Sequence, residues 1–506
     1  MDPNLDDSAV GSSGDLPPDE LREQGRRTVD WIADYLGGVG ELPVLSRAKP
    51  GDLLRVLPET GPEEAEPWEA IYDDLDKLIL PGITHWNHPR FLAYFAVTGS
   101  VPGILGEMLT AGLNVNGMLW RTSPAATELE QRTLAWLAHW LGLPNTLFGI
   151  ITDTASTSTL CALAAAREAI PGLDVRELGL AGRPEVPPLT LYTSDQSHSS
   201  VEKAALLLGI GRRGIRAIPS DANYQMSVGA LRSAIEEDLL SGQRPFCVSA
   251  TAGTTSTTSV DPLPQIAALC AQYKLWLHVD AAYAGAAAMV PELRARFEGW
   301  DAADSIVINP HKWLFTPYDC SVLYTRRPET LRRAFRLVPE YLRSDVGASP
   351  TQEQPPDLMD YGIQLGRRFR ALKLWIVFRR FGHAGLIDRI RAHISMARRF
   401  ADAIDASEDF ERLAPTPFSV VCFRHRPGIG PGTSNGTDLE AVTNDPYAEA
   451  NEDLLGRLNH SGRVLLSHTR LRGRFTLRLV IGNLKTRPTD IDEAWRLIQA
   501  EASLLH

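Results

Sequence analysis

Apolar residues in the middle of the chain gather in short runs that are separated by segments of helix length. Four runs of five or six residues lie at positions 189–194, 246–250, 275–279 and 305–309. Continuously apolar runs of this length are typical of parallel strands that are buried on both faces and joined by crossover helices. The pattern therefore predicts an α/β fold with a mostly parallel central sheet over residues 101–390.

The N-terminal pattern is helical. Apolar residues at helical spacing predict one helix over residues 19–36 and a second over residues 68–80, joined by a proline-rich connection at 43–67. Two helices joined by an extended connection make a poor core on their own. We therefore expect residues 19–100 to form a helical segment that packs on a second subunit, preceded by a flexible, acidic leader at 1–18.

The last third of the chain mixes strands and helices in a different way. Strands are predicted at 419–423, 464–467 and 475–481, and helices at 448–459 and 490–501. This mixture predicts a small α+β domain over residues 391–506. The Gly-, Pro- and Asn-rich stretch at 424–445 is typical of a surface loop.

Composition and charge narrow the functional classes. Sixty-two acidic residues against 51 basic ones give a net charge of −11, and the basic residues are not clustered, which argues against a nucleic-acid-binding protein. No run of 18 apolar residues exists, so no membrane span is expected. The five cysteines lie far apart without C-x-x-C spacing, so we expect a reduced, cytoplasmic protein with neither a disulfide framework nor a metal site.

Chemically active residues follow each of the four predicted strands. In chain order they are His198, Thr255, Asp280, and Asn309 together with Lys312. Ligands of an open parallel sheet bind beyond the carboxyl ends of its strands, so these side chains are expected at one edge. Upstream, T-A-S-T at 154–157 opens a helix predicted over 159–168, and free N–H groups at a helix start make an anion site.

Pyridoxal phosphate uses all of these groups at once. It needs a lysine for its aldehyde, an acid beside its ring nitrogen, a partner for its ring face and a cradle for its phosphate. Each residue alone also has a plainer interpretation, because Asp280 could cap a helix and His198 could be a core histidine. The combination, in this order, favours the cofactor site.

Longer strings carry a family resemblance. S-x-x-x-N-P-H-K-W lies at 305–313, and H-V-D-A-A-Y-A-G places Asp280 32 residues before Lys312. Further matching strings are L-P-G-I-T-H-W at 80–86, A-Y-F at 93–95, S-P-A-x-T-E-L-E at 123–130, S-D-Q-x-H-S-S-V-x-K-A at 194–204 and L-G-R-R-F-R-x-L-K at 365–373. Over residues 20–497 the chain resembles the group II pyridoxal-phosphate-dependent amino-acid decarboxylases and is most similar to the aromatic L-amino-acid decarboxylases. The resemblance implies the fold-type I, aspartate aminotransferase-like fold and a homodimer.

The resemblance also implies roles for single residues. Lys312 would bind the cofactor aldehyde, Asp280 would keep the ring nitrogen protonated, and His198 would stack on the ring. The further cofactor contacts that it implies are Ala155, Ser156, Thr255, Ala282 and Asn309. Tyr341 matches a loop tyrosine that returns a proton to Cα, and His311 would either stack on a lid or set the protonation of Lys312. The substrate contacts that it implies are Trp86, Tyr94, Phe95 and Gly366.

Four functions stay open on the sequence. The first is decarboxylation of an aromatic amino acid to its amine. The second is an aldehyde synthase, which typically has phenylalanine at the loop position, so that Tyr341 argues against it. A decarboxylase for a non-aromatic acid such as glutamate would need a cation near the substrate side chain. A non-enzyme that has kept the fold should have lost Lys312 or Asp280, and both are present.

The sequence says less about the substrate's ring than about the type of reaction. In the family, glycine at the position of Gly366 accompanies indole or dihydroxyphenyl substrates, so Gly366 favours tryptophan, 5-hydroxytryptophan or dihydroxyphenylalanine. Asn116 and Met118 stand where animal members place apolar and aromatic residues, and the pair at 96–97, Ala-Val, replaces Pro-Thr. The altered pocket keeps tyrosine, phenylalanine or a broad substrate range open.

Overall fold

The computed structural model describes residues 15–337, 355–429 and 441–505. The chain forms two compact units, residues 1–88 and 89–506. Residues 1–14 of the expected leader, Tyr341 and the middle of the expected loop at 424–445 lie outside the described residues.

The first unit is helical, and polar contacts link its two longer helices. Its α-helices in the described part are α2 (Pro18–Gly38), α3 (Asp52–Val56) and α4 (Trp68–Asp74). Trp68 Nε1 donates to Glu20 at 2.7 Å, and the hydroxyls of Thr28 and Tyr72 lie 2.6 Å apart. The second predicted helix changes to π-helical turns at Leu75–Ile79. No residue of α2 is buried, and its apolar stripe is partly to fully exposed within this unit.

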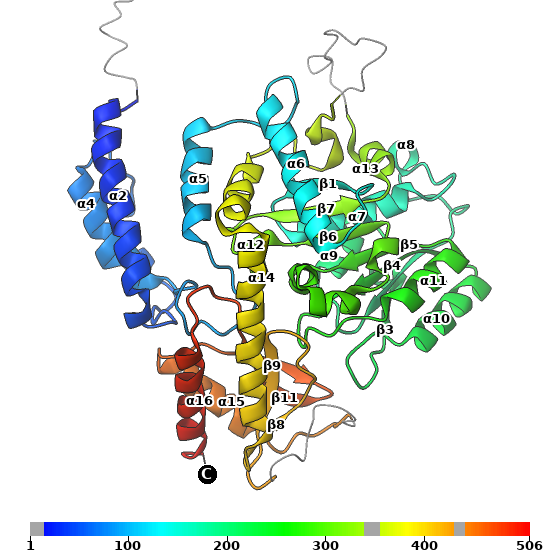
Figure 1. Ribbon diagram of the computed structural model, residues 1–506. Helices are drawn as coiled ribbons and strands as arrows, with labels where there is room; N and C mark the ends of the chain where they lie inside the picture. Colours follow the sequence, from blue (N-terminus) through cyan, green and yellow to red (C-terminus); the bar gives the residue numbers. More distant parts are fainter. Residues whose placement is uncertain (1–14, 338–354, 430–440, 506) are drawn as a thin grey trace, which may run out of the picture. The chain divides into compact units, whose positions relative to one another are not determined.

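Within the described residues, seven strands form the central sheet of the second unit, in the order β1-β7-β6-β5-β4-β2-β3 (Figure 1). They are β1 (Phe148–Thr152), β2 (Leu189–Ser194), β3 (Ile215–Ile218), β4 (Arg244–Thr251), β5 (Trp276–Asp280), β6 (Ser305–Ile308) and β7 (Ser321–Thr325). The pairs β2–β3, β2–β4, β4–β5 and β5–β6 are parallel, and β7 runs antiparallel between β6 and β1. The mostly parallel sheet and its four predicted strands are confirmed.

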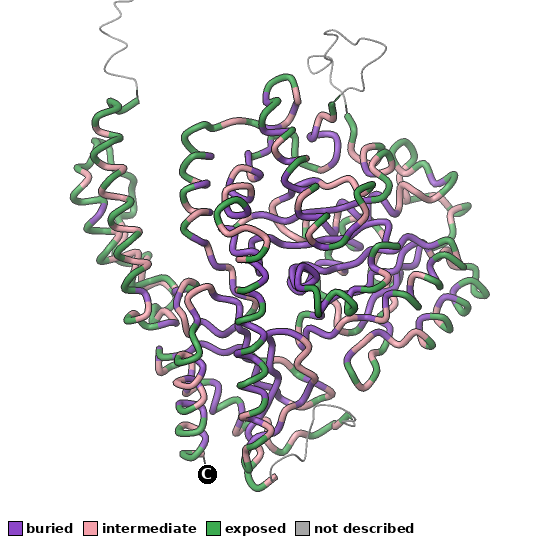
Figure 2. Tube along the Cα trace, viewed as in Figure 1, coloured by how far each residue is buried: buried purple, intermediate pink, exposed green. Residues whose placement is uncertain are grey.

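Strands β1, β3 and β7 were not predicted, and partial exposure accounts for β1 and β3 but not for β7, which is buried throughout. β1 and β3 are only half-buried at several positions, whereas β2, β5, β6 and β7 are buried throughout (Figure 2). β1 also contains Gly149, where an added Cβ would lie 2.8 Å from the ring of Tyr324 on the paired strand β7. Glycine is required there because a large neighbouring side chain approaches closely. A glycine also interrupts the run of apolar residues by which a buried strand is predicted.

Helices follow the strands of the central sheet and cover it. Those of the second unit are α5 (Val101–Leu113), α6 (Pro124–Leu141), α7 (Ala155–Glu168), α8 (Val175–Leu178), α9 (Ser200–Leu207), α10 (Val228–Leu240), α11 (Leu263–Tyr273), α12 (Pro310–Trp313), α13 (Pro328–Phe335), α14 (Arg370–Asp405), α15 (Ala448–His460) and α16 (Pro488–Ala502). The predicted helices at 448–459 and 490–501 correspond to α15 and α16. In the parts of the chain that the structure describes, no helix has both the length and the apolar content to cross a membrane.

A second, four-stranded antiparallel sheet lies in the C-terminal part. Its strands are β8 (Phe410–Arg412), β9 (Val420–His425), β10 (Ser467–Leu471) and β11 (Arg474–Val480), in the order β10-β11-β9-β8. The strand predicted at 464–467 was wrong in position, because β10 begins where the prediction ended. The buried run before it makes a single bridge, Leu465 to Phe91, whereas the alternately exposed, polar residues of β10 carry the ladder.

One long helix connects the two sheets. α14 packs against α5 and α6 at one end and against β8 and β9 at the other, as the yellow helix in Figure 1 shows. It bends at Gly382, whose φ of +66° lies in the left-handed region. Because α14 continues through position 390, the predicted domain boundary there falls inside a helix, and the domain limits stay a prediction.

Candidate active site

The parallel strands bring the lysine and the acid to one edge of the central sheet. β5 ends at Asp280, which is paired with Thr251 of β4 and with Val307 of β6. β6 is followed at once by Asn309 and by α12, which carries Lys312. Since the carboxyl ends of parallel strands meet at the same edge, the two predicted key residues lie close together.

The Lys312 amine has an enclosed, partly aromatic environment. Its Nζ lies 5.1 Å from the centroid of the Phe95 ring. Burial lowers the pKa of Lys312 from its ordinary value; the Asp280 carboxylate acts in the opposite direction, and Arg478 lowers it further. A lower pKa increases the fraction of neutral amine, which is the form that reacts with an aldehyde.

Asp280 is a buried carboxylate, and no ion-pair partner for it is found among residues 15–337, 355–429 and 441–505. One of its oxygens accepts a hydrogen bond from the Ala282 N–H at 3.0 Å, a local turn that holds the carboxylate in place. Burying a carboxylate is costly unless a cation faces it. The protonated ring nitrogen of pyridoxal phosphate is a cation of the required kind.

His198 presents an exposed ring just after β2. Its Nδ1 accepts a hydrogen bond from the Ser200 backbone N–H at 3.1 Å and lies 2.9 Å from the Ser200 hydroxyl. In the neutral ring the proton is therefore on Nε2. Partial removal of the ring from water lowers the pKa of His198. The Asp280 carboxylate acts in the opposite direction, and the Lys312 ammonium lowers this pKa further. A neutral, accessible imidazole suits stacking on a cofactor ring.

Two features fit a phosphate at the same edge. The N–H groups of Ala155 and Ser156 lie in the first turn of α7, and no side chain caps this helix start. Asn309 is buried, and its Oδ1 has no hydrogen-bond partner in the described part of the chain. A side-chain amide can present either its oxygen or its NH₂ group, so Asn309 is available to a bound ligand. Both β1 and β6 run antiparallel to β7, so α7 and Asn309 follow strands that end at one edge.

These features together match the requirements of pyridoxal phosphate, and comparison with known proteins agrees. The conserved-domain model of the pyridoxal-dependent decarboxylases matches residues 50–426. The chain belongs to this decarboxylase family. It is therefore an enzyme of fold type I, and its cofactor is pyridoxal 5′-phosphate.

Individual relatives of the decarboxylase are similar over nearly the whole chain. "Tyrosine decarboxylase 4" of Petroselinum crispum is 41% identical over 97% of this chain and 94% of its own length. "Phenylacetaldehyde synthase" of Petunia hybrida is 40% identical over 100% of this chain and 98% of its own. The crystal structure of Oryza sativa TDC with PLP and tryptamine has a TM-score of 0.90 at 36% identity, covering 97% of this chain and 100% of the other.

Two predicted site residues of the decarboxylase have surroundings that limit their chemistry. His311 is buried, and its Nδ1 accepts the Cys320 backbone N–H at 2.9 Å. Burial lowers the pKa of His311 to about 3, and Lys312 contributes to the decrease, so the ring is a fixed, neutral acceptor at neutral pH. Thr255 is exposed on the loop that follows β4. The catalytic role of His311 and the cofactor contact of Thr255 stay predictions.

The predicted substrate residues lie in different surroundings. Phe95 stacks on Tyr283, with ring centroids 3.9 Å apart, and faces Lys312. Tyr94 is 57% exposed. Trp86 belongs to the first unit and is 39% exposed. At Gly366 the nearest neighbour of an added Cβ would be the Asn116 amide nitrogen, at 3.8 Å. The substrate contacts of these residues stay predictions, as does the role of Tyr341.

Sequence reasoning missed Arg478. This residue of β11 is buried, and its guanidinium carbon lies 4.7 Å from the centroid of the Phe95 ring. Its Nε donates to the Ser256 carbonyl at 2.9 Å and its Nη1 to the Tyr94 carbonyl at 3.3 Å, while Nη2 has no hydrogen-bond partner in the described residues. The available signal was a charged residue inside the apolar run at 475–481.

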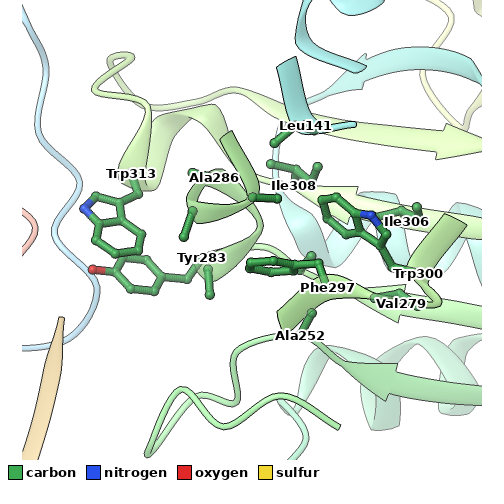
Figure 3. Close-up of a cluster of buried hydrophobic side chains, with 14 of the residues drawn as sticks. Leu141, Ala252, Val279, Tyr283, Ala286, Phe297, Trp300, Ile306, Ile308 and Trp313 are labelled. Carbon is green, nitrogen blue, oxygen red and sulfur yellow. The ribbon is translucent and has the colours of Figure 1, made fainter. Parts of the chain in front are cut away.

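An aromatic stack packs at the end of α12, the short helix that carries Lys312. The rings of Tyr283 and Trp313 are nearly parallel, with centroids 4.7 Å apart. Figure 3 shows the two side chains next to each other. The Tyr283 hydroxyl is 2.6 Å from that of Ser419, and Trp313 Nε1 donates to His393 at 3.0 Å. The aromatic residues of the D-A-A-Y and H-K-W strings thus fix the backbone that presents the acid and the lysine.

Proposed function

We propose that this decarboxylase converts an aromatic L-amino acid to the corresponding arylalkylamine and carbon dioxide. The arrangement of Lys312, Phe95 and Arg478 carries the proposal. The Phe95 ring has the Lys312 amine 5.1 Å from its centroid and the Arg478 guanidinium 4.7 Å from it. A reactive amine, a cation for a carboxylate and an aromatic surface are thus close together, as a planar, apolar amino acid requires. The tyrosine decarboxylase relative supports this substrate class.

In this proposal, different residues of the chain hold different parts of the cofactor. Pyridoxal phosphate, when bound, supplies the electron sink for the charge left at the substrate Cα when carbon dioxide departs. Lys312 binds its aldehyde, and Asp280 keeps its ring nitrogen protonated, because a nearby buried carboxylate raises the pKa of a base. His198 covers a face of the ring. Asn309 and the first turn of α7 bind the phosphate.

Arg478 binds the substrate carboxylate in this proposal. Its unpaired Nη2 offers a charge-assisted hydrogen bond, and the carbonyls of Ser256 and Tyr94 hold the other nitrogens in place. Arg478→Gln should raise KM by about tenfold or more, since a hydrogen bond to a charged group is lost. Arg470→Gln on the neighbouring strand β10 is the matched control and should leave KM unchanged. An unchanged KM for Arg478→Gln would place the carboxylate elsewhere.

The experiment that tests the substrate class uses purified enzyme loaded with pyridoxal phosphate. Carbon dioxide and amine are measured with tryptophan, 5-hydroxytryptophan, tyrosine, dihydroxyphenylalanine and phenylalanine, and with glutamate as the non-aromatic comparison. We expect kcat/KM for the best aromatic acid to exceed that for glutamate by at least about a hundredfold. Turnover of glutamate with no turnover of the aromatic acids would overturn the proposal.

The second candidate is an aromatic acetaldehyde synthase, which the similarity to the Petunia hybrida phenylacetaldehyde synthase favours. That reaction consumes oxygen and water and releases aldehyde, carbon dioxide, ammonia and hydrogen peroxide. Tyr341 argues against it, because a tyrosine can return a proton to Cα and phenylalanine cannot. Oxygen uptake during the same assays separates the two activities.

We also propose a homodimer in the cytoplasm. All five cysteines are free and buried, as suits a reducing compartment. α5 exposes apolar residues at helical spacing, and the set is Val101, Leu105, Met108, Leu109 and Leu113; a stripe of this kind is typical of a protein interface. Light scattering on the purified protein tests the dimer, and a monomer at micromolar concentration would contradict it.

A further inference from the structure

A cavity of about 700 Å³ lies at the other edge of the central sheet. Its lining includes Arg244 and Trp276, the first residues of β4 and β5, and Asp304, which directly precedes β6. Asp280 is the last residue of β5. The cavity and the cofactor site therefore lie at opposite ends of the same strands, and the mechanism proposed above uses no residue of the cavity.

One wall of the cavity is apolar. Phe246, Cys270, Trp276 and Leu277 line it and are buried. The indole nitrogen of Trp276 already donates to the Ser305 hydroxyl at 2.9 Å. With that polar atom satisfied, the wall offers carbon and sulfur surface to a ligand.

The rim of the cavity is cationic. Arg244, Lys274, Arg326 and Arg327 line it against a single carboxylate, Asp304. The Asp304 carboxylate already has partners in the protein, because Arg327 Nε lies 2.7 Å from one oxygen and the Leu277 N–H donates to the other at 2.9 Å. The lining therefore carries an excess of positive charge in a chain whose net charge is −11.

Three of the rim cations have no ion-pair partner within the described ranges. Arg244 donates to the Pro171 carbonyl at 3.0 Å, and Arg326 donates to the Ala303 carbonyl at 3.4 Å and to that of Asp301. The Lys274 side chain has no hydrogen-bond or ion-pair partner in the same ranges and is exposed. Carbonyl groups orient the two arginines but do not neutralise them, and Lys274 is not neutralised either. The like charges around one cavity therefore favour an anion there.

We propose that this cavity binds a small arylalkyl carboxylate that lacks an amino group. Its volume lies in the range of small-molecule sites, which combine an apolar lining with a few charged groups. Guanidinium groups bind carboxylates with two parallel hydrogen bonds, and the aromatic wall accepts a ring. The cationic rim disfavours the ammonium group of an amino acid or of an arylalkylamine. The site therefore selects against the substrate and the product of the proposed reaction.

The test is calorimetric titration of the holoenzyme with 3-phenylpropionate and with indole-3-acetate. The neutral 3-phenylpropanamide is the matched ligand control. We expect the carboxylates to bind, the amide to bind at least about tenfold more weakly, and the affinity for the carboxylates to fall as salt rises.

Two variants probe the two halves of the site. Lys274→Asn combined with Arg326→Gln removes rim charge, and Asn is suitable because Lys274 has a left-handed φ of 57°. Ala271→Phe fills the cavity from α11 without changing its charge. Each should weaken carboxylate binding by about tenfold or more while KM for the amino-acid substrate stays unchanged. Arg496→Gln on α16 is the surface control and should change neither.

Several outcomes would overturn the proposal. Absence of binding at millimolar carboxylate would do so, as would equal affinity for the amide. Binding that survives both cavity variants but is lost in Arg478→Gln would show that the carboxylate occupies the active site instead. Thermal unfolding of each variant checks that it is folded, and the two independent variants keep the test decisive if one is not.

Discussion

At the scale of single residues, the candidate active site contains buried polar groups that lack a full set of partners within the described residues. Arg478 Nη2 and Asn309 Oδ1 are buried without a hydrogen bond, and the buried Asp280 carboxylate accepts one from the Ala282 N–H but has no ion pair. Such groups destabilise the free protein by roughly 1–3 kcal/mol each. In the proposed mechanism, cofactor and substrate would supply the missing partners when they bind.

The charge of Asp280 can be removed with little change of shape. Asp280→Asn should lower kcat by about 10³-fold or more, because the ring nitrogen loses the partner that keeps it protonated. Cofactor content, measured by absorbance, should fall much less than the rate. Asp492→Asn on the exposed face of α16 is the control. A variant that keeps roughly a tenth of the rate would show that another group holds the proton.

Tyr341 is predicted to decide between two products. Tyr341→Phe keeps the ring but removes the hydroxyl proton that Cα needs after carbon dioxide leaves. Amine formation should fall by about a hundredfold or more, as for loss of a general acid, while aldehyde, ammonia and peroxide appear in step with oxygen uptake. An oxygen electrode and chromatography of the products measure both routes. Unchanged amine formation without oxygen uptake would assign the proton to another residue.

At the scale of elements, the cofactor site depends on how closely β1 and β7 approach. β1 leads directly to α7, whose first turn is the expected phosphate site, and Gly149 lets the Tyr324 ring of β7 lie against it. Tyr324 is held in turn, because its hydroxyl donates to the Leu134 carbonyl at 2.8 Å. A change in β1 should therefore be transmitted to cofactor binding.

Gly149→Ala tests this coupling. The new methyl group would lie 2.8 Å from the Tyr324 ring and about as close to Leu134, at 3.0 Å, so we expect a loss of about 1–3 kcal/mol of stability. The dissociation constant for pyridoxal phosphate should rise as well. Gly229→Ala in α10, where nothing lies within 4 Å of the added Cβ, is the control and should be neutral or stabilising. Thermal unfolding and cofactor titration measure the two effects.

At the scale of the whole molecule, stability should depend on pH through buried histidines. Burial lowers the pKa of His311 to about 3 and those of His278 and His393 to about 4. Between these values and 6.5 the unfolded chain binds protons that the folded chain does not, so the free energy of unfolding decreases as the pH is lowered. Burial raises the pKa of Asp261 to about 7, so the folded chain binds its proton first and this residue opposes the trend.

The expected size of this pH dependence follows from the coupling between proton binding and folding. Between pH 7 and pH 5 each of the three histidines costs about 2 kcal/mol, and Asp261 offsets about 2 kcal/mol. The free energy of unfolding should therefore fall by about 4 kcal/mol over this interval. His393→Gln keeps an acceptor for Trp313 Nε1 but removes one titrating group, so about 2 kcal/mol of the pH dependence should disappear. Denaturant unfolding at both pH values measures it, and an unchanged pH dependence would contradict the assignment.

The sequence alone was sufficient for what local patterns encode. Four buried parallel strands appeared as apolar runs. Lys312, Asp280 and His198 were predicted as site residues because active residues follow such strands at a sheet edge. The cofactor followed from that set of groups and from the strings around it. All of these signals are short-range, since burial on both faces and the position after a strand leave a mark within about ten residues.

The tertiary structure decided what depends on distant segments. β7 lies antiparallel between β1 and β6 in the sheet, and the order of the strands cannot be read from any single run of residues. Arg478 reaches Phe95 from a distant strand, and four cations from three separate segments line one cavity. Such proximities arise from packing between remote elements, whose free energy is shared among many weak contacts. A single residue or motif therefore carries no sign of them, and they emerge only when the chain is folded.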